Sequence, residues 1–202
     1  MKNNVNFIKM LFDMSKAFSE MIPLGIKAHD FVLEDVTSKR KYSFDDVKGE
    51  KGTLIFFICN HCPYVHHVID ELIMIANDYR VQGIGFAAIS SNDFEAYPDD
   101  APNKMIDFAF DHNFEFPYLI DYDQEVAKKY NASCTPDFYL YDQQNKLIYH
   151  GQIDDSRPGN NIPTSGNDLR NAIDSILYNR SLNSVQKPSM GCNIKWKKNS
   201  VL

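Results

Sequence analysis

The chain has 202 residues, a formal net charge of −6 at pH 7 and 44% hydrophobic residues. This composition is ordinary for a globular protein that buries its own core, and the acidic balance argues against a nucleic-acid-binding surface. Four cysteines are too few for a disulfide-stapled scaffold, so we interpret them as reactive or structural thiols in a reducing compartment. No stretch approaches the roughly 18 apolar residues of a membrane span, and the N-terminus lacks the features of a signal peptide. We therefore expect a cytoplasmic protein that does not bind membranes.

The N-terminal segment carries apolar residues at helical spacing between Phe7 and Phe18. This spacing predicts an amphipathic helix within residues 1–21, ahead of a main domain over residues 22–180 and a C-terminal extension over residues 181–202. We expect the apolar face to pack on the main domain or on a second copy of the chain, so a homodimer is one prediction. A membrane-surface or partner helix is the weaker alternative, because the segment carries few basic residues.

The first elements of the main domain are a short edge hairpin, formed by residues 31–33 and 41–43, and a turn of helix capped by Ser43. Residues 53–58 then form an apolar, β-branched and aromatic run, which predicts a buried strand. A helix follows from Pro63, because proline suits the first helical turn.

Two cysteines, Cys59 and Cys62, stand at this junction between strand and helix. Cys62 lies in the first helical turn, where unpaired N–H groups and the positive end of the helix dipole favour the reactive thiolate. We therefore predict that Cys62 is the nucleophile of a redox site, and this prediction requires a sulfur that solvent can reach.

The rest of the domain alternates strands and helices. Residues 83–89 predict a strand parallel to the first, reached by a right-handed crossover. Ser165 and Asp168 have the spacing of a capping box for the last helix. No element is predicted after residue 181. The other predicted elements are a helix around residues 105–110, a strand over 116–120, a helix over 124–130, a hairpin of 138–141 with 147–149, and a helix over 169–177.

Several segments together resemble the thioredoxin superfamily, and within it the redoxin branch of peroxiredoxin-like proteins grouped with alkyl hydroperoxide reductase and thiol-specific antioxidant. The resemblance implies a thioredoxin-like α/β fold, with a mixed central sheet flanked by helices, an N-terminal β-hairpin and a C-terminal extension. It implies no organic cofactor, and a thioredoxin-type protein as reductant. The matching stretches are residues 26–31, 59–64, 91–94, 97–100, 134–138 and 191–197.

The same resemblance implies a site around the cysteines. It places a cis Thr135-Pro136 bond against the thiols and Cys134 nearby, and it gives Cys62 the position of the nucleophilic cysteine of thioredoxin. Cys59 then lies one turn upstream of the usual second cysteine, which is a departure from the thioredoxin pattern. The resolving cysteine stays open among Cys59, Cys134 and Cys192. The predicted substrate-binding residues are Thr135, Pro136, Asn92 and Arg157.

Two activities are compatible with this site: thiol–disulfide exchange and peroxide reduction. The peroxidatic cysteine of the family sits in a Pro-x-x-x-Thr/Ser-x-x-Cys motif and is assisted by an arginine. The residues before Cys62 do not match that motif, and no arginine precedes Pro136. Arg157 could take the place of that arginine if the fold brought it close to Cys62. Peroxide reduction is therefore the less favoured of the two predicted activities.

Two other classes of function are the alternatives to redox catalysis. A copper-type metal-binding protein of the same fold would use the cysteines and histidines crowded into residues 59–67, which are Cys59, His61, Cys62, His66 and His67. A non-catalytic redoxin-like binding protein would keep the fold without turnover. A resident metal is not our prediction.

The loop over residues 90–102 is acidic and long, whereas the charged residues after Asp174 are all basic. We predict that residues 191–196 fold back over this loop, because the charges are complementary and the tail carries a lone tryptophan.

Overall fold

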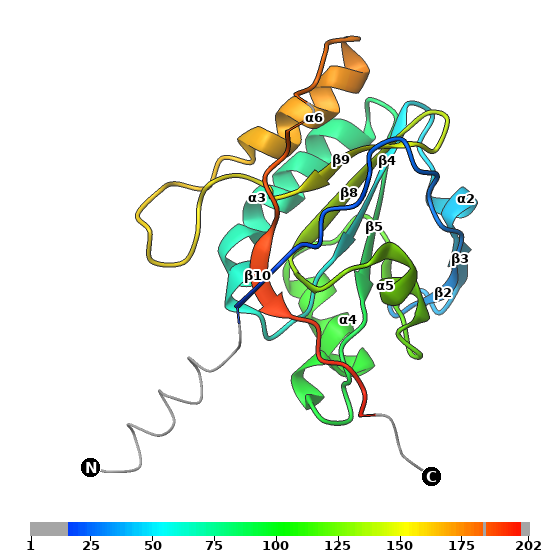
Figure 1. Cartoon of the computed structure of the whole chain (residues 1–202). Coiled ribbons are helices and arrows are strands. Elements are labelled where there is room, and N and C mark those ends of the chain that lie inside the picture. The colour runs from blue at the N-terminus through cyan, green and yellow to red at the C-terminus, as the bar shows by residue number, and fades with distance from the viewer. Residues whose placement is uncertain (1–15, 184, 199–202) are drawn as a thin grey trace.

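The computed structural model describes residues 16–183 and 185–198 of the chain. At its centre lies a mixed sheet flanked by helices, which is the α/β architecture that the sequence predicts (Figure 1). In spatial order, its seven strands are β3 (Lys41–Ser43), β2 (Val32–Asp35), β6 (Tyr118–Ile120), β5 (Ile84–Ser90), β4 (Gly52–Phe57), β8 (Asp137–Asp142) and β9 (Leu147–Gly151). A second sheet of three strands has the order β1 (Lys16–Phe18), β10 (Met190–Asn193) and β7 (Cys134–Thr135).

The described helices are α2 (Phe44–Val47), α3 (Pro63–Arg80), the 3₁₀ turn η1 (Pro98–Asp100), α4 (Pro102–Asp111), α5 (Glu125–Tyr130) and α6 (Asn167–Leu177). Within residues 16–183 and 185–198, no helix has the length and apolar character that a membrane span needs.

Strand β4 is an interior strand of the central sheet, and all six of its residues are buried. It pairs in parallel with β5 and antiparallel with β8. Its alternate residues point to opposite faces of the sheet, and each face has its own core. Leu54 and Phe56 pack with α3, α4 and α6, whereas Ile55 and Phe57 pack with α2 and α5. A strand buried on both faces has no polar side, which explains the unbroken apolar run in its sequence.

The predicted edge hairpin is confirmed as β2 and β3. Ser43 then starts α2 with a capping box: its hydroxyl accepts from the N–H of Asp46, and the Asp46 carboxylate accepts from the N–H of Ser43. Each bond satisfies a backbone donor that the short helix leaves unpaired, so the cap fixes where the chain turns from the hairpin into the domain.

Asp35, at the end of β2, ties the hairpin to the central sheet. Its carboxylate is 3% exposed and accepts from the N–H of Tyr118 at 2.9 Å, from the hydroxyl of Thr37 at 2.7 Å and from the N–H of Ser38 at 2.8 Å. Burial raises the pKa of Asp35, but these hydrogen bonds to the charged form outweigh it and hold the pKa below the usual value.

The Asp35→Asn variant is therefore expected to lower the free energy of unfolding by about 1–3 kcal/mol at pH 7. A carboxyl whose folded pKa is depressed stabilises the fold above its unfolded pKa, near 4, and this contribution disappears as the pH falls through the folded pKa. Denaturant unfolding of both proteins at pH 7 and at pH 3 measures the difference. A gap between the two proteins that stays constant across this pH range would contradict the account.

The N-terminal and C-terminal ends of the described chain differ from the sequence prediction. Most of the predicted N-terminal helix, residues 1–15, lies outside the described residues, and Lys16–Phe18 is strand β1 rather than helix. Strand β10, in a tail where no element is predicted, pairs antiparallel with both β1 and β7. Both short strands form because their backbone groups find distant partners, which local periodicity cannot reveal.

The start of α6 also differs from the prediction. The N-cap is Gly166, in a left-handed conformation with φ 63°, and no side chain caps the helix. The predicted box of Ser165 and Asp168 is wrong because the buried Asp154 takes its place. The carboxylate of Asp154 accepts from the N–H groups of Ser165 and Gly166, both at 2.7 Å.

Candidate active site

Cys62 lies between β4 and α3. It is the N-cap residue of α3, and proline stands at the next position. Its sulfur is 2.9 Å from the sulfur of Cys192 and 3.2 Å from the carbonyl oxygen of Thr135. Burial raises the pKa of Cys62, but hydrogen bonds with Cys192, Cys59 and Thr135 and from the N–H of Val65 outweigh it and hold the pKa well below the usual value. The thiolate is thus the favoured form at this sulfur.

Cys192 reaches Cys62 because β10 runs past the N-terminal end of α3 (Figure 1). It stands opposite Thr135 in the pairing of β10 with β7. The hydrogen bond to Cys62, together with burial, raises the pKa of the Cys192 thiol. The pair is therefore asymmetric, with the pKa lowered at Cys62 and raised at Cys192.

Cys59 is buried just after β4 and also contacts Cys62. Its sulfur is 3.3 Å from the hydroxyl of Thr135. Burial, the contact with Cys62 and the charge of Asp100 raise the pKa of Cys59. Thr135 thus contacts two cysteines, Cys59 through its hydroxyl and Cys62 through its carbonyl oxygen. The bond from Thr135 to Pro136 is cis, as the resemblance implies.

Cys134 does not join this cluster, although it precedes Thr135 directly. Successive side chains of a strand point in opposite directions, so the two residues face different surroundings. The polar neighbours of the Cys134 sulfur are the hydroxyl of Ser19 and the carbonyl oxygens of Pro136 and Ser189, each at 4.0 Å. Burial and the charge of Asp137 raise the pKa of its thiol. The resemblance implies that Cys134 lies near Cys59 and Cys62. Its backbone does, because it precedes Thr135, but its sulfur points to other residues.

The cysteine sulfurs are closed to solvent, which contradicts the expectation of an accessible Cys62. Cys62 is 0% exposed and Cys192 is 1% exposed. Strand β10 packs tightly beside these sulfurs: at Gly191 its backbone lies so close to Thr135 that an added Cβ would meet the carbonyl oxygen of Thr135 at 1.8 Å. We therefore expect that β10 must move before a substrate can reach Cys62.

Comparisons with known proteins place the chain in a family. A sequence model of the AhpC/TSA family matches residues 24–150. The chain belongs to the AhpC/TSA family. Thiol-disulfide oxidoreductase ResA of Bacillus subtilis (strain 168) is 27% identical over 135 residues, which cover 65% of this chain and 69% of ResA.

Solved structures agree with this family and with the thioredoxin-like fold. An uncharacterized conserved protein from Geobacillus kaustophilus is 49% identical, with a TM-score of 0.90, over 92% of this chain and 98% of that one. A hypothetical protein from Sinorhizobium meliloti 1021 is 43% identical, with a TM-score of 0.86, over 89% and 98% of the two chains. A putative thiol:disulfide interchange protein DsbE from Chlorobium tepidum shares the fold at 18% identity, with a TM-score of 0.62, over 78% and 99%. The predicted superfamily and fold are confirmed.

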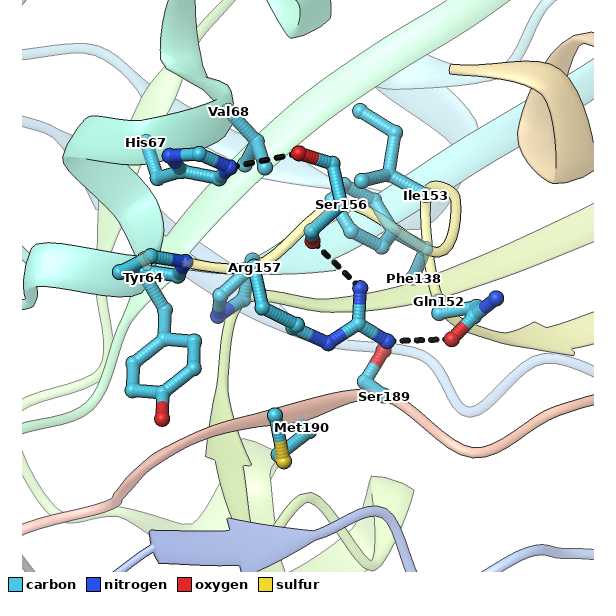
Figure 2. A pocket seen from close by; sticks show the side chains of 12 residues that line it. Tyr64, His67, Val68, Phe138, Gln152, Ile153, Ser156, Arg157, Ser189 and Met190 are labelled. Atoms are coloured by element: carbon cyan, nitrogen blue, oxygen red, sulfur yellow. Dashed lines mark hydrogen bonds between the residues drawn. The ribbon is translucent and has the colours of Figure 1, made fainter. Parts of the chain in front are cut away.

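Arg157 is the residue that could stand in for the arginine that assists peroxide reduction in the AhpC/TSA family. It lines a pocket whose other residues include Pro136. Figure 2 shows Arg157 in this pocket beside Gln152 and Ser156. Its guanidinium is engaged within its own loop, however, where it donates to the carbonyl oxygens of Asp154 and Ser156 at 2.6 Å each and to the side chain of Gln152. This pocket borders the cis-proline loop but not the sulfur of Cys62.

Asn92, another predicted substrate-binding residue of this AhpC/TSA protein, is buried. Its amide nitrogen donates to Asp100 at 2.8 Å, and its amide oxygen accepts from the N–H of Lys195 at 2.8 Å. Asn92 therefore links the acidic loop to the C-terminal tail. Asp100 is a site residue that sequence reasoning missed, because nothing in the local sequence separates it from the exposed acids around it.

The tail folds over the acidic loop, as predicted, but charge complementarity is not what holds it. The N–H of Asp93 donates to the carbonyl oxygen of Lys195 at 2.8 Å, and the Lys195 ammonium lies over the ring of Tyr97. Lys197 similarly lies over Phe94. Among the described residues, no ion pair joins the lysines of the tail to the acids of the loop. Backbone hydrogen bonds and aromatic rings hold the segment that carries Cys192.

The residues of the alternative metal site, within 59–67, do not all come together. His66 packs edge-on against Phe108, and a ring nitrogen of His67 lies 2.7 Å from the hydroxyl of Ser156. Both histidines thus have partners in other parts of the fold, away from Cys62. His61 alone of the three histidines stays near a cysteine.

Proposed function

We propose that this AhpC/TSA protein is a thiol–disulfide oxidoreductase in which Cys62 is the nucleophile and Cys192 resolves the product. Thiol-dependent redox chemistry is the activity that the family match and the ResA relative support. The observation that carries the assignment of residues is the 2.9 Å distance between the sulfurs of Cys62 and Cys192, with Cys62 at the N-terminus of α3.

The proposed reaction has two exchange steps. The Cys62 thiolate attacks one sulfur of a substrate disulfide, a bond forms between them, and the other substrate sulfur leaves as a thiolate that takes up a proton. Cys192, once deprotonated, then attacks the Cys62 sulfur and releases the second substrate thiol. The substrate gains two electrons and the protein is left with a Cys62–Cys192 disulfide. A thioredoxin-type protein would return the two electrons to the pair.

The groups around the pair support these roles. Cys62 has the helix N-terminus and the depressed pKa that a thiolate nucleophile needs. Cys59, also close to Cys62, is the remaining candidate for the resolving role. Cys134 has the least support, because its sulfur faces Ser19 and Asp137. Thr135 and Pro136 are the proposed substrate-contacting residues, because Thr135 contacts both sulfurs and Pro136 follows it through the cis bond.

Peroxide reduction, and an antioxidant role based on it, has less support. Cys59 occupies the position three residues before Cys62 where the motif has Thr or Ser, and the guanidinium of Arg157 is engaged elsewhere. For the rest of the chain, we propose a thioredoxin-like domain over residues 22–180, with the C-terminal extension supplying Cys192. We also propose a cytoplasmic location, because four cysteines are too few for the disulfide scaffold of a small secreted protein. A homodimer stays a prediction.

A turnover assay tests the proposed function. The full chain, supplied with a thioredoxin system as reductant and a peptide disulfide as substrate, is expected to reduce the substrate catalytically. The Cys62→Ser variant is expected to lose this turnover, whereas Cys134→Ser keeps it. Equal rates for the wild type and Cys62→Ser would exclude Cys62 as the nucleophile, and no turnover in either would favour a non-catalytic binding protein.

A further inference from the structure

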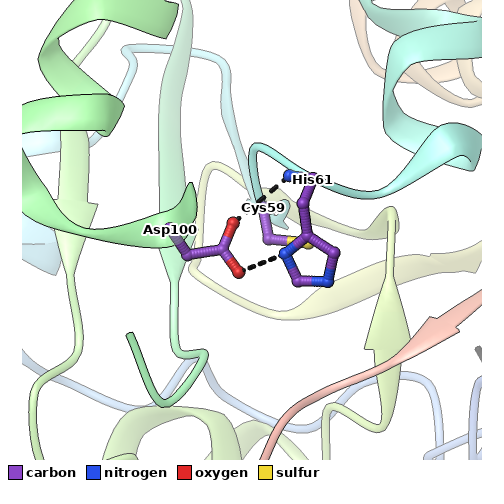
Figure 3. Close-up of side chains that lie close together, drawn as sticks. All are labelled: Cys59, His61 and Asp100. Carbon is purple, nitrogen blue, oxygen red and sulfur yellow. Dashed lines mark hydrogen bonds and ion pairs between the residues drawn. The ribbon is translucent and has the colours of Figure 1, made fainter. Parts of the chain in front are cut away.

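Three metal-ligating side chains meet directly behind the redox pair. Cys59 comes from the end of β4, His61 from the loop that leads into α3, and Asp100 from the end of η1 (Figure 3). One ligand atom of each, a sulfur, a ring nitrogen and a carboxylate oxygen, lies within 4.8 Å of the other two. Cys59 and Asp100 are each 1% exposed, so this is an interior cluster rather than a group of surface acids.

The carboxylate of Asp100 is held in place before any ligand arrives. One of its oxygens accepts from the backbone N–H of Asn60 at 2.8 Å and of His61 at 3.3 Å. The other accepts from the amide of Asn92 at 2.8 Å. Hydrogen bonds of this kind orient the ligands of metal sites, and they restrict the carboxylate to one arrangement.

The loop that carries His61 is fixed in the same way. The side chain of Asn60 donates to the carbonyl oxygen of Asp99 at 2.9 Å and accepts from the hydroxyl of Tyr118 at 3.0 Å. The ring of His61 stacks on that of Tyr97, with 11° between the two planes. Two of the three groups, Cys59 and Asp100, are thus buried side chains, and the third is oriented by an aromatic neighbour.

His61 supplies the observation that points to a ligand. Both of its ring nitrogens are buried, and the Nε2 atom has no hydrogen-bond partner among the described residues. The Nδ1 atom is paired with a carboxylate oxygen of Asp100 at 2.5 Å. Buried polar atoms are nearly always partnered, because leaving them without a partner is costly. A cation among these groups would give an imidazole nitrogen a partner.

We propose that Cys59, His61 and Asp100 form a zinc-binding site. A sulfur, an imidazole nitrogen and a carboxylate oxygen are the three ligand types that Zn²⁺ takes in proteins. One thiolate, one carboxylate and a neutral imidazole balance the two charges of the ion, which suits a buried position. As the zinc–sulfur bond forms, the thiol proton of Cys59 passes to solvent. Three protein ligands leave a fourth coordination position for water.

The site gives Cys59 a role apart from the redox pair. The cysteines of the C-x-x-C segment would then serve two purposes, zinc binding by Cys59 and disulfide exchange by Cys62 with Cys192. The inference does not depend on turnover at Cys62, because its ligands are a separate set of side chains. It also differs from the metal set suggested by sequence crowding, since His66 and His67 take no part.

Cobalt is the probe that tests the site, because Co²⁺ occupies zinc sites and absorbs light when bound to thiolate. The reduced, metal-free full chain is expected to bind one Co²⁺ per chain, with a thiolate-to-cobalt band in the near ultraviolet that Zn²⁺ abolishes. Cys59→Ser is expected to remove this band, and His61→Ala and Asp100→Asn to weaken binding at least about tenfold. His66→Gln is the matched control and should bind as the wild type does.

Circular dichroism of each variant checks that it is folded. His61→Ala should fold, because His61 lies in a loop and is not part of either hydrophobic core. Absence of the band in the wild type, or an unchanged band in Cys59→Ser, would overturn the proposal. An equal loss in His66→Gln would overturn it too. Mapping the Cys62–Cys192 disulfide in metal-free protein reports on the proposed function separately, so the two proposals fail independently.

Discussion

The Cys192→Ser variant is expected to stop after the first exchange step and accumulate a mixed disulfide between Cys62 and half of the substrate. In the wild type, the Cys192 sulfur is held 2.9 Å from Cys62, so the second step is intramolecular. Positioning of this kind is worth many orders of magnitude over attack by a free thiol, so turnover should fall by roughly a hundredfold or more. Intact-protein mass spectrometry after one equivalent of peptide disulfide measures the adduct, and the turnover assay measures the rate.

Cys59→Ser is the matched control for this prediction, because Cys59 also borders Cys62. If Cys192 resolves, Cys59→Ser should release the substrate half as the wild type does. Accumulation of the adduct in Cys59→Ser, together with clean release in Cys192→Ser, would assign the resolving role to Cys59 instead.

The Gly191→Val variant is expected to expose Cys62. A Cβ at this position would meet the carbonyl oxygen of Thr135 at 1.8 Å, and the atom it meets is backbone, which cannot turn aside. Overpacking of this kind costs about 1–3 kcal/mol, and β10 relieves it by lifting from β7. Since about 1.4 kcal/mol is tenfold in an equilibrium, the fraction of molecules with β10 open should rise by roughly fivefold to a hundredfold.

Alkylation of the reduced protein measures this opening, because Cys62 is 0% exposed when β10 is in place. The modification rate of Cys62, followed by peptide mass spectrometry, should rise by that factor in Gly191→Val. Gly159→Asn is the control, since nothing lies within 4 Å of a Cβ at Gly159. An unchanged rate in Gly191→Val would mean that β10 is not the barrier to Cys62.

The junction that organises the site is predictable from sequence because its signals are local. An apolar run followed by proline places β4, α3 and Cys62 correctly, and side-chain spacing alone indicates a helix N-terminus at that sulfur. The cis bond of Thr135 to Pro136 beside the thiols follows from the family resemblance rather than from the residues themselves.

The parts of the site that sequence reasoning missed are set by distant partners. Strand β10 is four residues, Met-Gly-Cys-Asn, without apolar alternation, and it exists because β1 and β7 lie on either side of it. Asp100 sits among exposed acids, and its burial depends on the N–H groups of Asn60 and His61, some forty residues earlier. Equally, no spacing rule could say that Cys192 faces Cys62 while Cys134 faces Ser19.

The disulfide pattern of the oxidised protein tests the central claim most directly. The full chain is oxidised with one equivalent of a peptide disulfide, remaining thiols are alkylated under denaturing conditions, and the digest is analysed by mass spectrometry. The account predicts a peptide pair joined through Cys62 and Cys192, with Cys59 and Cys134 alkylated. A dominant Cys59–Cys62 bond, or an oxidised protein in which Cys192 is still alkylated, would contradict it.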